Sequence, residues 1–373
     1  MATKFRKMGH SPDYVIIFAI GFLVLFGLLM LASASSAIAQ ADTGDSLFYL
    51  KRQLMFGLGA GLIGFLITYN LYYGVYRKRW ISTFLLVFSI FLLLATFSPL
   101  GVERGGATRW INLGGFEFQP SEILKIALVV YLAIWLTAKK SRQESFKEGY
   151  IPFVVVIGFI SVLLFLQKST SPVFILASVA LIMYFMSGAK LRYIGLTILG
   201  GIAALALLVA VTSYRLDRIT TFLNPGAADP QGAGYHINQA KTAIGSGGLT
   251  GVGYGQSVFS KVEGRLPEPF GDSIFAIIAE EFGFIGSILI LSLFTVLVLR
   301  IFLLAKKARD NFAQLLLVGF GSLIGIQAVV NIGAMSGILP LTGAPLPFIS
   351  YGGTALAVFM TIGGITANIS KYS

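Results

Sequence analysis

The sequence predicts an all-α integral membrane protein with ten transmembrane helices and a long extracytoplasmic loop between helices 7 and 8. Three observations predict this fold class. The 373 residues are 56% hydrophobic and 12% charged, with a mean hydropathy of +0.82, which lies outside the usual composition of soluble domains. Charge-free runs long enough to cross the hydrocarbon layer recur along the chain. Basic residues gather in alternate connections between these runs.

Seven charge-free runs predict one helix each, at 14–34, 54–76, 80–99, 150–167, 169–189, 193–213 and 282–299. An eighth run, 119–138, is apolar except for Glu122 and Lys125 near its start. The charge-free tract 311–370 is too long for one crossing, and prolines between residues 337 and 350 divide it. This division adds two spans, near 313–335 and 351–369.

Ten crossings place both termini on one side of the membrane. With the N-terminus inside, the inner segments hold 17 of the 28 basic residues but only four of the 16 acidic residues. Cytoplasmic loops are enriched in Lys and Arg, so both termini are expected to be cytoplasmic. The attraction of these basic residues to the anionic inner leaflet also accounts for the pI of about 9.8. The sequence has no basic cluster interleaved with aromatic residues, so nucleic-acid binding is not expected.

Residues 1–373 are expected to form a single membrane domain with two polar outer segments. The first, 98–119, is expected to be a loop that ends with Pro120 in the first turn of the next helix. The second, 214–271, is much longer than an ordinary connection, which is typical of a functional loop. A short amphipathic helix on the outer leaflet is predicted by four spaced apolar residues, Ile237, Ala240, Ala243 and Ile244. The glycines that follow predict tight turns.

Carboxylates gather where the predicted helices begin on the outer side. Asp272 stands where the long loop meets a helix, which suits a general base, although a helix N-cap explains an aspartate there equally well. Glu280 and Glu281 lie two turns deeper, where a charge needs a wet cavity or a cationic partner from another helix. Glu122 and Lys125 can pair along their own helix. A polar cavity open to the outside would account for all of them.

Cations on the same side, Arg109, Arg218, Lys241 and Arg265, fit a lipid-linked diphosphate because arginine matches phosphate oxygens, although solvated surface arginines are the simpler explanation for each. There is no cysteine, and the two histidines are too far apart for zinc. A site for a divalent cation, Mg or Mn, held by Asp272 and by phosphate oxygens of the substrate is an open alternative. No nucleotide or organic cofactor is expected, since the glycine run lacks a phosphate-loop pattern.

Eight short motifs follow one another along the chain: Gln119-Pro-Ser-Glu-Ile-Leu-Lys125, Asn224-Pro225, Gly232-Ala-Gly-Tyr, Ala243-Ile-Gly-Ser-Gly-Gly-Leu249, Leu266-Pro-Glu, Asp272-Ser-Ile-Phe-Ala, Ala279-Glu-Glu and Pro347-Phe-Ile-Ser-Tyr-Gly-Gly353. This ordered set resembles the SEDS family of bacterial cell-wall proteins, which includes FtsW, RodA and SpoVE. The resemblance extends from the first predicted helix to the last.

The resemblance implies an inverting peptidoglycan glycosyltransferase of the bacterial cytoplasmic membrane, with an extracytoplasmic active site. It would polymerise lipid II into a nascent glycan strand, release undecaprenyl diphosphate, and work with a class B penicillin-binding protein and divisome or elongasome proteins. Asp272 matches the catalytic aspartate of the family. The expected substrate-binding residues are five that fall on family motif positions, Arg109, Glu122, Lys125, Arg218 and Glu281, together with Lys241 and Ser350.

One motif departs from the family pattern. Gln167-Lys-Ser-Thr-Ser171 stands in place of the usual Gln-Pro-Asp, so an acidic residue is missing and Lys168 reverses its charge. The motifs around 266 and 348 lean toward the division branch, FtsW, while the short tails fit RodA equally. Two rival functions are a lipid II flippase and a non-catalytic scaffold that recruits a transpeptidase. A flippase must open to both sides, whereas the intramembrane charges cluster toward the outside.

Overall fold

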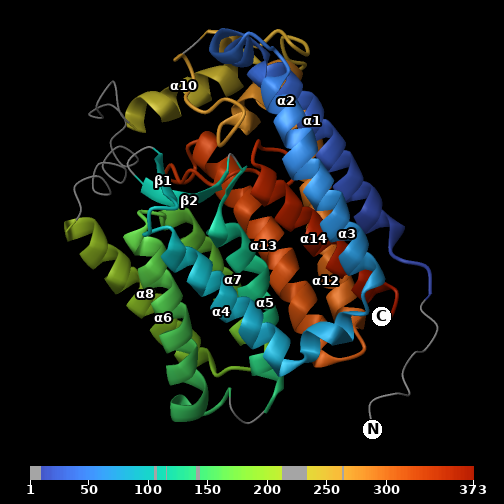
Figure 1. Cartoon of the computed structure of the whole chain (residues 1–373), viewed down its shortest axis with the longest axis vertical. Helices are drawn as coiled ribbons and strands as arrows, with labels where there is room; N and C mark the ends of the chain where they lie inside the picture. Colours follow the sequence, from blue (N-terminus) through green and yellow to red (C-terminus); the bar gives the residue numbers. More distant parts are fainter. Residues whose placement is uncertain (1–9, 105–106, 115, 140–142, 212–232, 263) are drawn as a thin grey trace.

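The computed structural model of the chain is mostly helical and describes residues 10–104, 107–114, 116–139, 143–211, 233–262 and 264–373 (Figure 1). Its elements are α1 Tyr14–Thr43, α2 Phe48–Arg52, η1 Gln53–Gly59, α3 Ala60–Asn70, η2 Tyr73–Arg77, α4 Arg79–Ala95, β1 Gly101–Arg104, β2 Ala107–Leu113, β3 Phe116–Phe118, α5 Pro120–Thr137, η4 Phe146–Tyr150, α6 Ile151–Leu166, α7 Thr170–Met186, α8 Leu191–Val211, α10 Ala233–Ser246, α11 Val258–Lys261, α12 Ile274–Lys307, α13 Asn311–Met335 and α14 Gly353–Ser370.

Within the described residues, seven helical segments are long and apolar enough to cross a membrane. They are α1, the continuous segment α2–η1–α3, α5, the segment η4–α6, α12, α13 and α14. Helices α4, α7 and α8 are apolar but shorter. Each predicted span corresponds to one of these helices. The chain is therefore a multi-pass membrane protein, and the count of ten crossings stays a prediction.

The two ends of the described chain lie side by side at one end of the bundle (Figure 1). The backbone N–H of His10 donates to the carbonyl of Lys371 at 3.0 Å, and that of Asp13 donates to Ser370 Oγ at 2.9 Å. An even number of crossings requires this arrangement. The sheet and α10 lie toward the opposite end of the bundle (Figure 1). Which end faces the cytoplasm stays a prediction from the charge count.

The prediction of an all-α chain is wrong for the first outer segment. Strands β1, β2 and β3 form a three-stranded antiparallel sheet in that order, with Gly101 opposite Ile111 and Ile111 opposite Phe118. The inward positions Ala107, Ile111 and Phe118 are buried. Gly114 takes a left-handed φ of 63° at the turn between β2 and β3, which glycine adopts without strain. The strands are too short for a clear alternating pattern in the sequence.

The core of the bundle is formed by α13, α5 and α14. In the most apolar 18-residue window of each helix, 78% of the residues of α13 and 72% of those of α5 and of α14 are buried. In the α2–η1–α3 segment the share is 17%. Polar side chains on the three central helices therefore face protein, and the outer helices face lipid. Their buried polar residues must find partners inside the bundle, because an unpaired polar group there is costly.

The second predicted span, 54–76, is displaced toward the N-terminus. The helix occupies Phe48–Asn70, and the chain then turns sharply into η2. Asn368 of α14 holds this turn, because its Nδ2 donates to Tyr69 O at 2.7 Å and its Oδ1 accepts from the backbone N–H of Tyr73 at 3.0 Å. A long-range contact therefore ends a helix that hydropathy alone continues to residue 76.

The amphipathic helix expected within the long outer segment is confirmed as α10, but its expected location on the leaflet is wrong. Its apolar residues Ile237, Ala240 and Ala243 are buried, and the helix contacts α12 and α13. An apolar helical face buries equally well against protein and against lipid, so periodicity alone does not distinguish the two. The part of the long segment from 212 to 232 lies outside the described residues.

Helix α12 is broken at Gly283, where φ is 64° and ψ is −160°. The glycine-rich segment 247–255 packs into this break, since Val252 N donates to Glu280 O and Phe284 N donates to Gly248 O. A Cβ on Gly251 would lie 2.1 Å from Glu281 O, and a Cβ on Gly283 would lie 2.4 Å from Gly251 N. The glycines therefore allow two backbones to touch, in addition to forming turns.

Candidate active site

Asp272 lies directly before α12 and is half-buried. The N-cap position of α12 is Ser273, so Asp272 does not occupy the cap position that the sequence left open. Its carbonyl oxygen accepts a hydrogen bond from Asn331 Nδ2 at 2.7 Å. The side chain therefore projects from a residue whose backbone is held by the central helix α13.

The residues on both sides of Asp272 are held by further hydrogen bonds. Gly271 O accepts from the hydroxyl of Ser350 at 2.8 Å, and Phe270 O accepts from the backbone N–H of Tyr351 at 2.9 Å. After Asp272, Ser273 Oγ donates to Pro267 O at 2.7 Å. The segment 267–273 is thus bonded to itself and to the loop 336–352, which we name the α13–α14 loop.

Gly343 of the α13–α14 loop faces the carboxylate of Asp272. Gly343 has a left-handed φ of 68°, and a Cβ built on it would lie 3.1 Å from Asp272 Oδ2. A side chain at this position would be strained and would crowd the carboxylate. A glycine here keeps the loop from crowding Asp272 Oδ2 at this position.

Backbone strain gathers around the same place. Among the described residues, three non-glycine residues have positive φ, namely Lys168 at 55°, Glu268 at 47° and Phe348 at 66°. Glu268 precedes Asp272 by four residues, and Phe348 lies in the α13–α14 loop. Lys168 lies at the turn between α6 and α7, which contacts this loop because Ser171 Oγ donates to Thr342 O. Strained residues cluster at functional sites, which favours this region as the active site.

Glu122 and Lys125 form a buried ion pair, as their spacing on one helix allows. Lys125 Nζ lies 2.6 and 2.7 Å from the two carboxylate oxygens of Glu122 and 2.8 Å from Gln327 Oε1. Both side chains are at most 3% exposed. Gln327 Nε2 donates in turn to Pro345 O at 2.8 Å. Gln327 of α13 therefore connects the pair to the α13–α14 loop.

Glu280 and Glu281 are buried at the break in α12, and neither forms an ion pair within the part of the chain that the structure describes. Glu280 accepts from the hydroxyl of Ser257 and from the backbone N–H of Val258 at 2.8 Å. Glu281 accepts from the hydroxyl of Ser33 at 2.5 Å. Among the described residues, hydroxyl and amide donors of α1 and of the start of α11 take the place of the cationic partner expected from another helix.

The predicted cations are not brought to one point. Arg109 lies on β2, and its guanidinium donates to Lys168 O. Lys241 is exposed on α10, and its side chain lies against Gly337, since a Cβ on that glycine would overlap the lysine chain. Arg218 lies outside the described residues. Arg265 stacks on the ring of Phe259, with its guanidinium carbon 4.6 Å from the ring centroid.

Sequence reasoning missed three residues that hold the site together. Gln327 and Asn331 are amides one helical turn apart on α13, and an amide pair at this spacing in an apolar span is the signal that points to them. His236 of α10 lies 2.7 Å from Ser273 Oγ through Nε2. Because Ser273 gives its hydroxyl hydrogen to Pro267 O, Nε2 of His236 must be the donor in this contact. Ser350, expected to bind substrate, is 4% exposed and bonds Gly271 O and Leu346 N.

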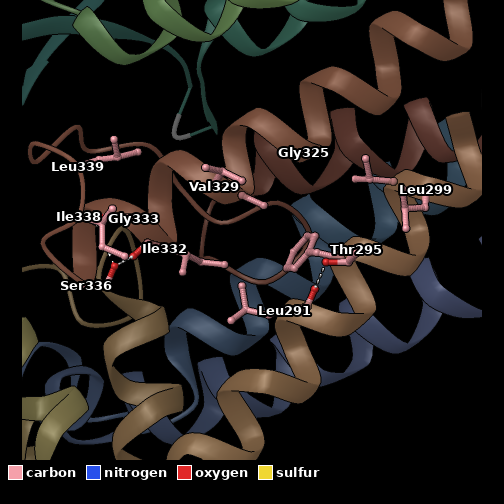
Figure 2. Close-up of a pocket in the computed structure, with 13 residues that line it drawn as sticks. Leu291, Thr295, Leu299, Gly325, Val329, Ile332, Gly333, Ser336, Ile338 and Leu339 are labelled. Carbon is pink, nitrogen blue, oxygen red and sulfur yellow. Dashed lines mark hydrogen bonds between the residues drawn. The ribbon is translucent and has the colours of Figure 1, made fainter.

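A groove of about 430 Å³ lies between α12 and α13 (Figure 2). Its lining is apolar apart from the hydroxyls of Thr295 and Ser336, which donate to carbonyls of their own helices, Leu291 O and Ile332 O, both at 2.8 Å. Figure 2 shows Leu299 and Val329 among the labelled residues of this groove. It suits an apolar guest, and Asp272 is not among its lining residues.

Comparison with known proteins agrees with these features. The family model of the cell cycle proteins FtsW, RodA and SpoVE matches residues 14–373. Stage V sporulation protein E of Bacillus subtilis is 38% identical over 97% of this chain and 98% of that protein. A probable peptidoglycan glycosyltransferase FtsW of Trichlorobacter lovleyi is 39% identical over 96% of this chain and 93% of that protein.

Two solved structures share the fold. A chain from a peptidoglycan synthase complex, described as coordinating polymerization and crosslinking, has a TM-score of 0.79 at 26% identity, covering 97% of this chain and 98% of that chain. The Rod shape determining protein RodA of Thermus thermophilus has a TM-score of 0.69 at 27% identity, covering 96% of each chain. The match over nearly the whole chain shows that this protein belongs to the FtsW/RodA/SpoVE family of cell cycle proteins.

Proposed function

We propose that this protein is a peptidoglycan glycosyltransferase that polymerises lipid II on the outer face of the bacterial cytoplasmic membrane. The observation that carries the proposal is Asp272, a half-buried carboxylate whose neighbouring backbone is held by hydrogen bonds from α13 and from the α13–α14 loop. The names of its relatives, probable peptidoglycan glycosyltransferases, support the same reaction.

Asp272 acts as the general base in this proposal. Its carboxylate takes the proton from the 4-hydroxyl of the acceptor sugar, and the resulting oxygen attacks the anomeric carbon of the lipid-linked donor. The bond from that carbon to the diphosphate breaks with inversion, and undecaprenyl diphosphate leaves with the bond's electron pair. One positioned base contributes about 10²- to 10⁴-fold to such a rate.

The growing charge on the diphosphate needs cations. Lys241 is exposed, and Arg109 is partly exposed, so these are the described cations that we assign to the leaving group, together with Arg218 of the segment outside the described residues. Glu122, Lys125 and Glu281 are buried, and we assign them a role in holding the helices around the site.

A divalent cation fits this site only with help from the substrate. Within the described ranges, no group of three His, Cys, Asp or Glu side chains is placed to hold a metal. Mg²⁺ is often held by one or two carboxylates plus substrate phosphates, and Asp272 supplies one half-buried carboxylate beside Gly343. When bound, Mg²⁺ or Mn²⁺ would neutralise charge on the diphosphate.

We also propose a class B penicillin-binding protein as the partner, since a similar chain was solved in a complex that couples polymerization with crosslinking. The relatives include a sporulation protein, FtsW proteins and RodA, which leaves both division and elongation as settings. Divisome or elongasome proteins would then recruit the chain to the site of growth.

The proposal is tested by incubating the purified full chain with fluorescent lipid II and separating the products by gel electrophoresis. Glycan polymer is expected. A second assay reconstitutes the chain in vesicles that contain labelled lipid II and measures dithionite quenching. Transfer of lipid between leaflets without polymer would support a flippase instead, and neither activity, with or without the partner, would support a scaffold.

A further inference from the structure

We propose that Asn331 is a positioning residue that sets the location of the Asp272 carboxylate, with Gln327 as its support. The inference rests on the proposed function and adds a positioning residue to it. It concerns the two amides on the inner face of α13, the most buried helix of the bundle.

The contacts of Asn331 join the two segments that face each other across the site. Its Nδ2 donates one hydrogen to Asp272 O and the other to Ala344 O, both at 2.7 Å. Ala344 follows Gly343, the residue that faces the Asp272 carboxylate. One planar amide therefore fixes the separation between the backbone of the base and the loop opposite its side chain.

The orientation of the Asn331 amide is determined by its partners. If the amide were flipped, Oδ1 would face two carbonyl oxygens and both bonds would be lost. As placed, Oδ1 is buried and has no hydrogen-bond partner among the residues that the structure describes. A buried unpartnered acceptor is destabilising, and an apolar residue of similar size would avoid it. The asparagine is better explained by the two carbonyls that it holds.

Gln327 extends the same connection by one helical turn. Its Nε2 donates to Pro345 O, and its Oε1 accepts from Lys125 Nζ, both at 2.8 Å. The orientation of the Gln327 amide is thus fixed by the ammonium of Lys125, which in turn is fixed by Glu122. The buried ion pair therefore anchors the α13–α14 loop at Pro345, next to the carbonyl that Asn331 holds.

A general base acts only within hydrogen-bond reach of the proton that it removes. The Asp272 side chain follows its own backbone, whose carbonyl accepts the hydrogen bond from Asn331. A displacement of the base by about 1 Å costs on the order of 10²-fold in rate. Loss of the Asn331 amide should therefore slow the chemical step and leave substrate binding largely intact.

The test is Asn331→Ala in the full chain, with lipid II polymerisation measured against lipid II concentration and the folded fraction measured by thermal unfolding in detergent. We expect kcat to fall about 100-fold. We expect KM to change by less than about threefold, because Asn331 holds backbone carbonyls of the protein and its loss acts on the transition state, which lowers kcat and kcat/KM together. The matched control is Asn368→Ala, which removes an equally buried amide that holds the turn at Tyr69 and Tyr73. It should destabilise the fold to a similar extent while kcat per folded molecule stays at the wild-type value.

A wild-type kcat for folded Asn331→Ala, or an equal loss of kcat in Asn368→Ala, overturns the inference. If Asn331→Ala does not fold, Asn331→Ser keeps one donor and should give an intermediate kcat; a wild-type kcat there overturns it as well. In the Asp272→Asn background, the Asn331 substitution should not lower the residual rate further. Failure of the proposed function is distinct, because Asp272→Asn would then polymerise lipid II at the wild-type rate.

Discussion

Helices α5 and α12 both bury carboxylates in the membrane bundle, but they stabilise them differently. On α5, Glu122 is paired with Lys125, and a neutral amide completes the lysine's contacts. At the break in α12, Glu280 and Glu281 accept hydrogen bonds from serine hydroxyls and a backbone N–H, and no basic residue of the described ranges forms an ion pair with either. The α5 site is thus held by charge, and the α12 site by the shape of an inserted loop.

This difference predicts which substitutions each site tolerates. A charge-held site depends on two side chains, and removal of one leaves the other buried and unpaired. A loop-held site depends on the approach of two backbones, so it is most sensitive where glycine allows that approach. The comparison predicts a large effect from one lysine on α5, a smaller effect from a glycine of α12, and the smallest from a single hydroxyl.

The largest expected effect is that of Lys125→Met. The variant leaves the Glu122 carboxylate buried without a cation, and we expect the free energy of unfolding to fall by about 3–5 kcal/mol. The double variant Glu122→Gln with Lys125→Met should recover much of this loss. Thermal or denaturant unfolding of the detergent-solubilised chain measures both. The control is Lys51→Met, whose exposed partner is Asp45, and a loss there as large as in Lys125→Met would contradict the account.

A smaller loss is expected for Gly283→Ala. Alanine at φ 64° and ψ −160° is strained, and its Cβ would lie 2.4 Å from Gly251 N, so the inserted loop must shift. We expect a cost of about 1–3 kcal/mol from the backbone strain. Gly245→Ala is the matched control, because no atom lies within 4 Å of the Cβ it would add. Equal stabilities for the two variants would show that the break in α12 is not held by the loop.

The smallest of these effects is expected for Ser33→Ala. The variant removes the hydroxyl that donates to Glu281 at 2.5 Å, and we expect a loss of about 0.5–1.5 kcal/mol because the backbone N–H groups of Gly255 and Ser257 still donate to this carboxylate. Ser35→Ala is the control, because the hydroxyl of Ser35 donates to Leu31 O of its own helix. A difference in the melting temperatures of the two variants checks the prediction, and identical values would remove Ser33 from the account.

Much of the fold was predictable because hydropathy is a local property. Each predicted span corresponds to a helix, Pro120 does begin α5, and Glu122 with Lys125 pair at the spacing that one helix allows. Periodicity also located the amphipathic helix α10. These features depend on residues within a few turns of one another, which is the range that sequence patterns report.

The features that failed depend on residues far apart in the chain. Asn368 ends the second span through contacts to residues about 300 positions away, and the partners of Glu280 stand at the start of α11, 22 and 23 positions before it. The separation between Asn331 and Asp272 is 59 residues. Hydropathy treats such amides as isolated polar interruptions, so the connection from Lys125 through Gln327 to the α13–α14 loop appears only in the folded chain.

The catalytic role of Asp272 is tested most directly by the polymerisation rate of Asp272→Asn with fluorescent lipid II, beside Asp45→Asn, the same change at an exposed aspartate. We predict that Asp272→Asn folds normally and loses about 10²- to 10⁴-fold in rate, while Asp45→Asn polymerises like the wild type. Glycan made by folded Asp272→Asn at the wild-type rate would contradict the account.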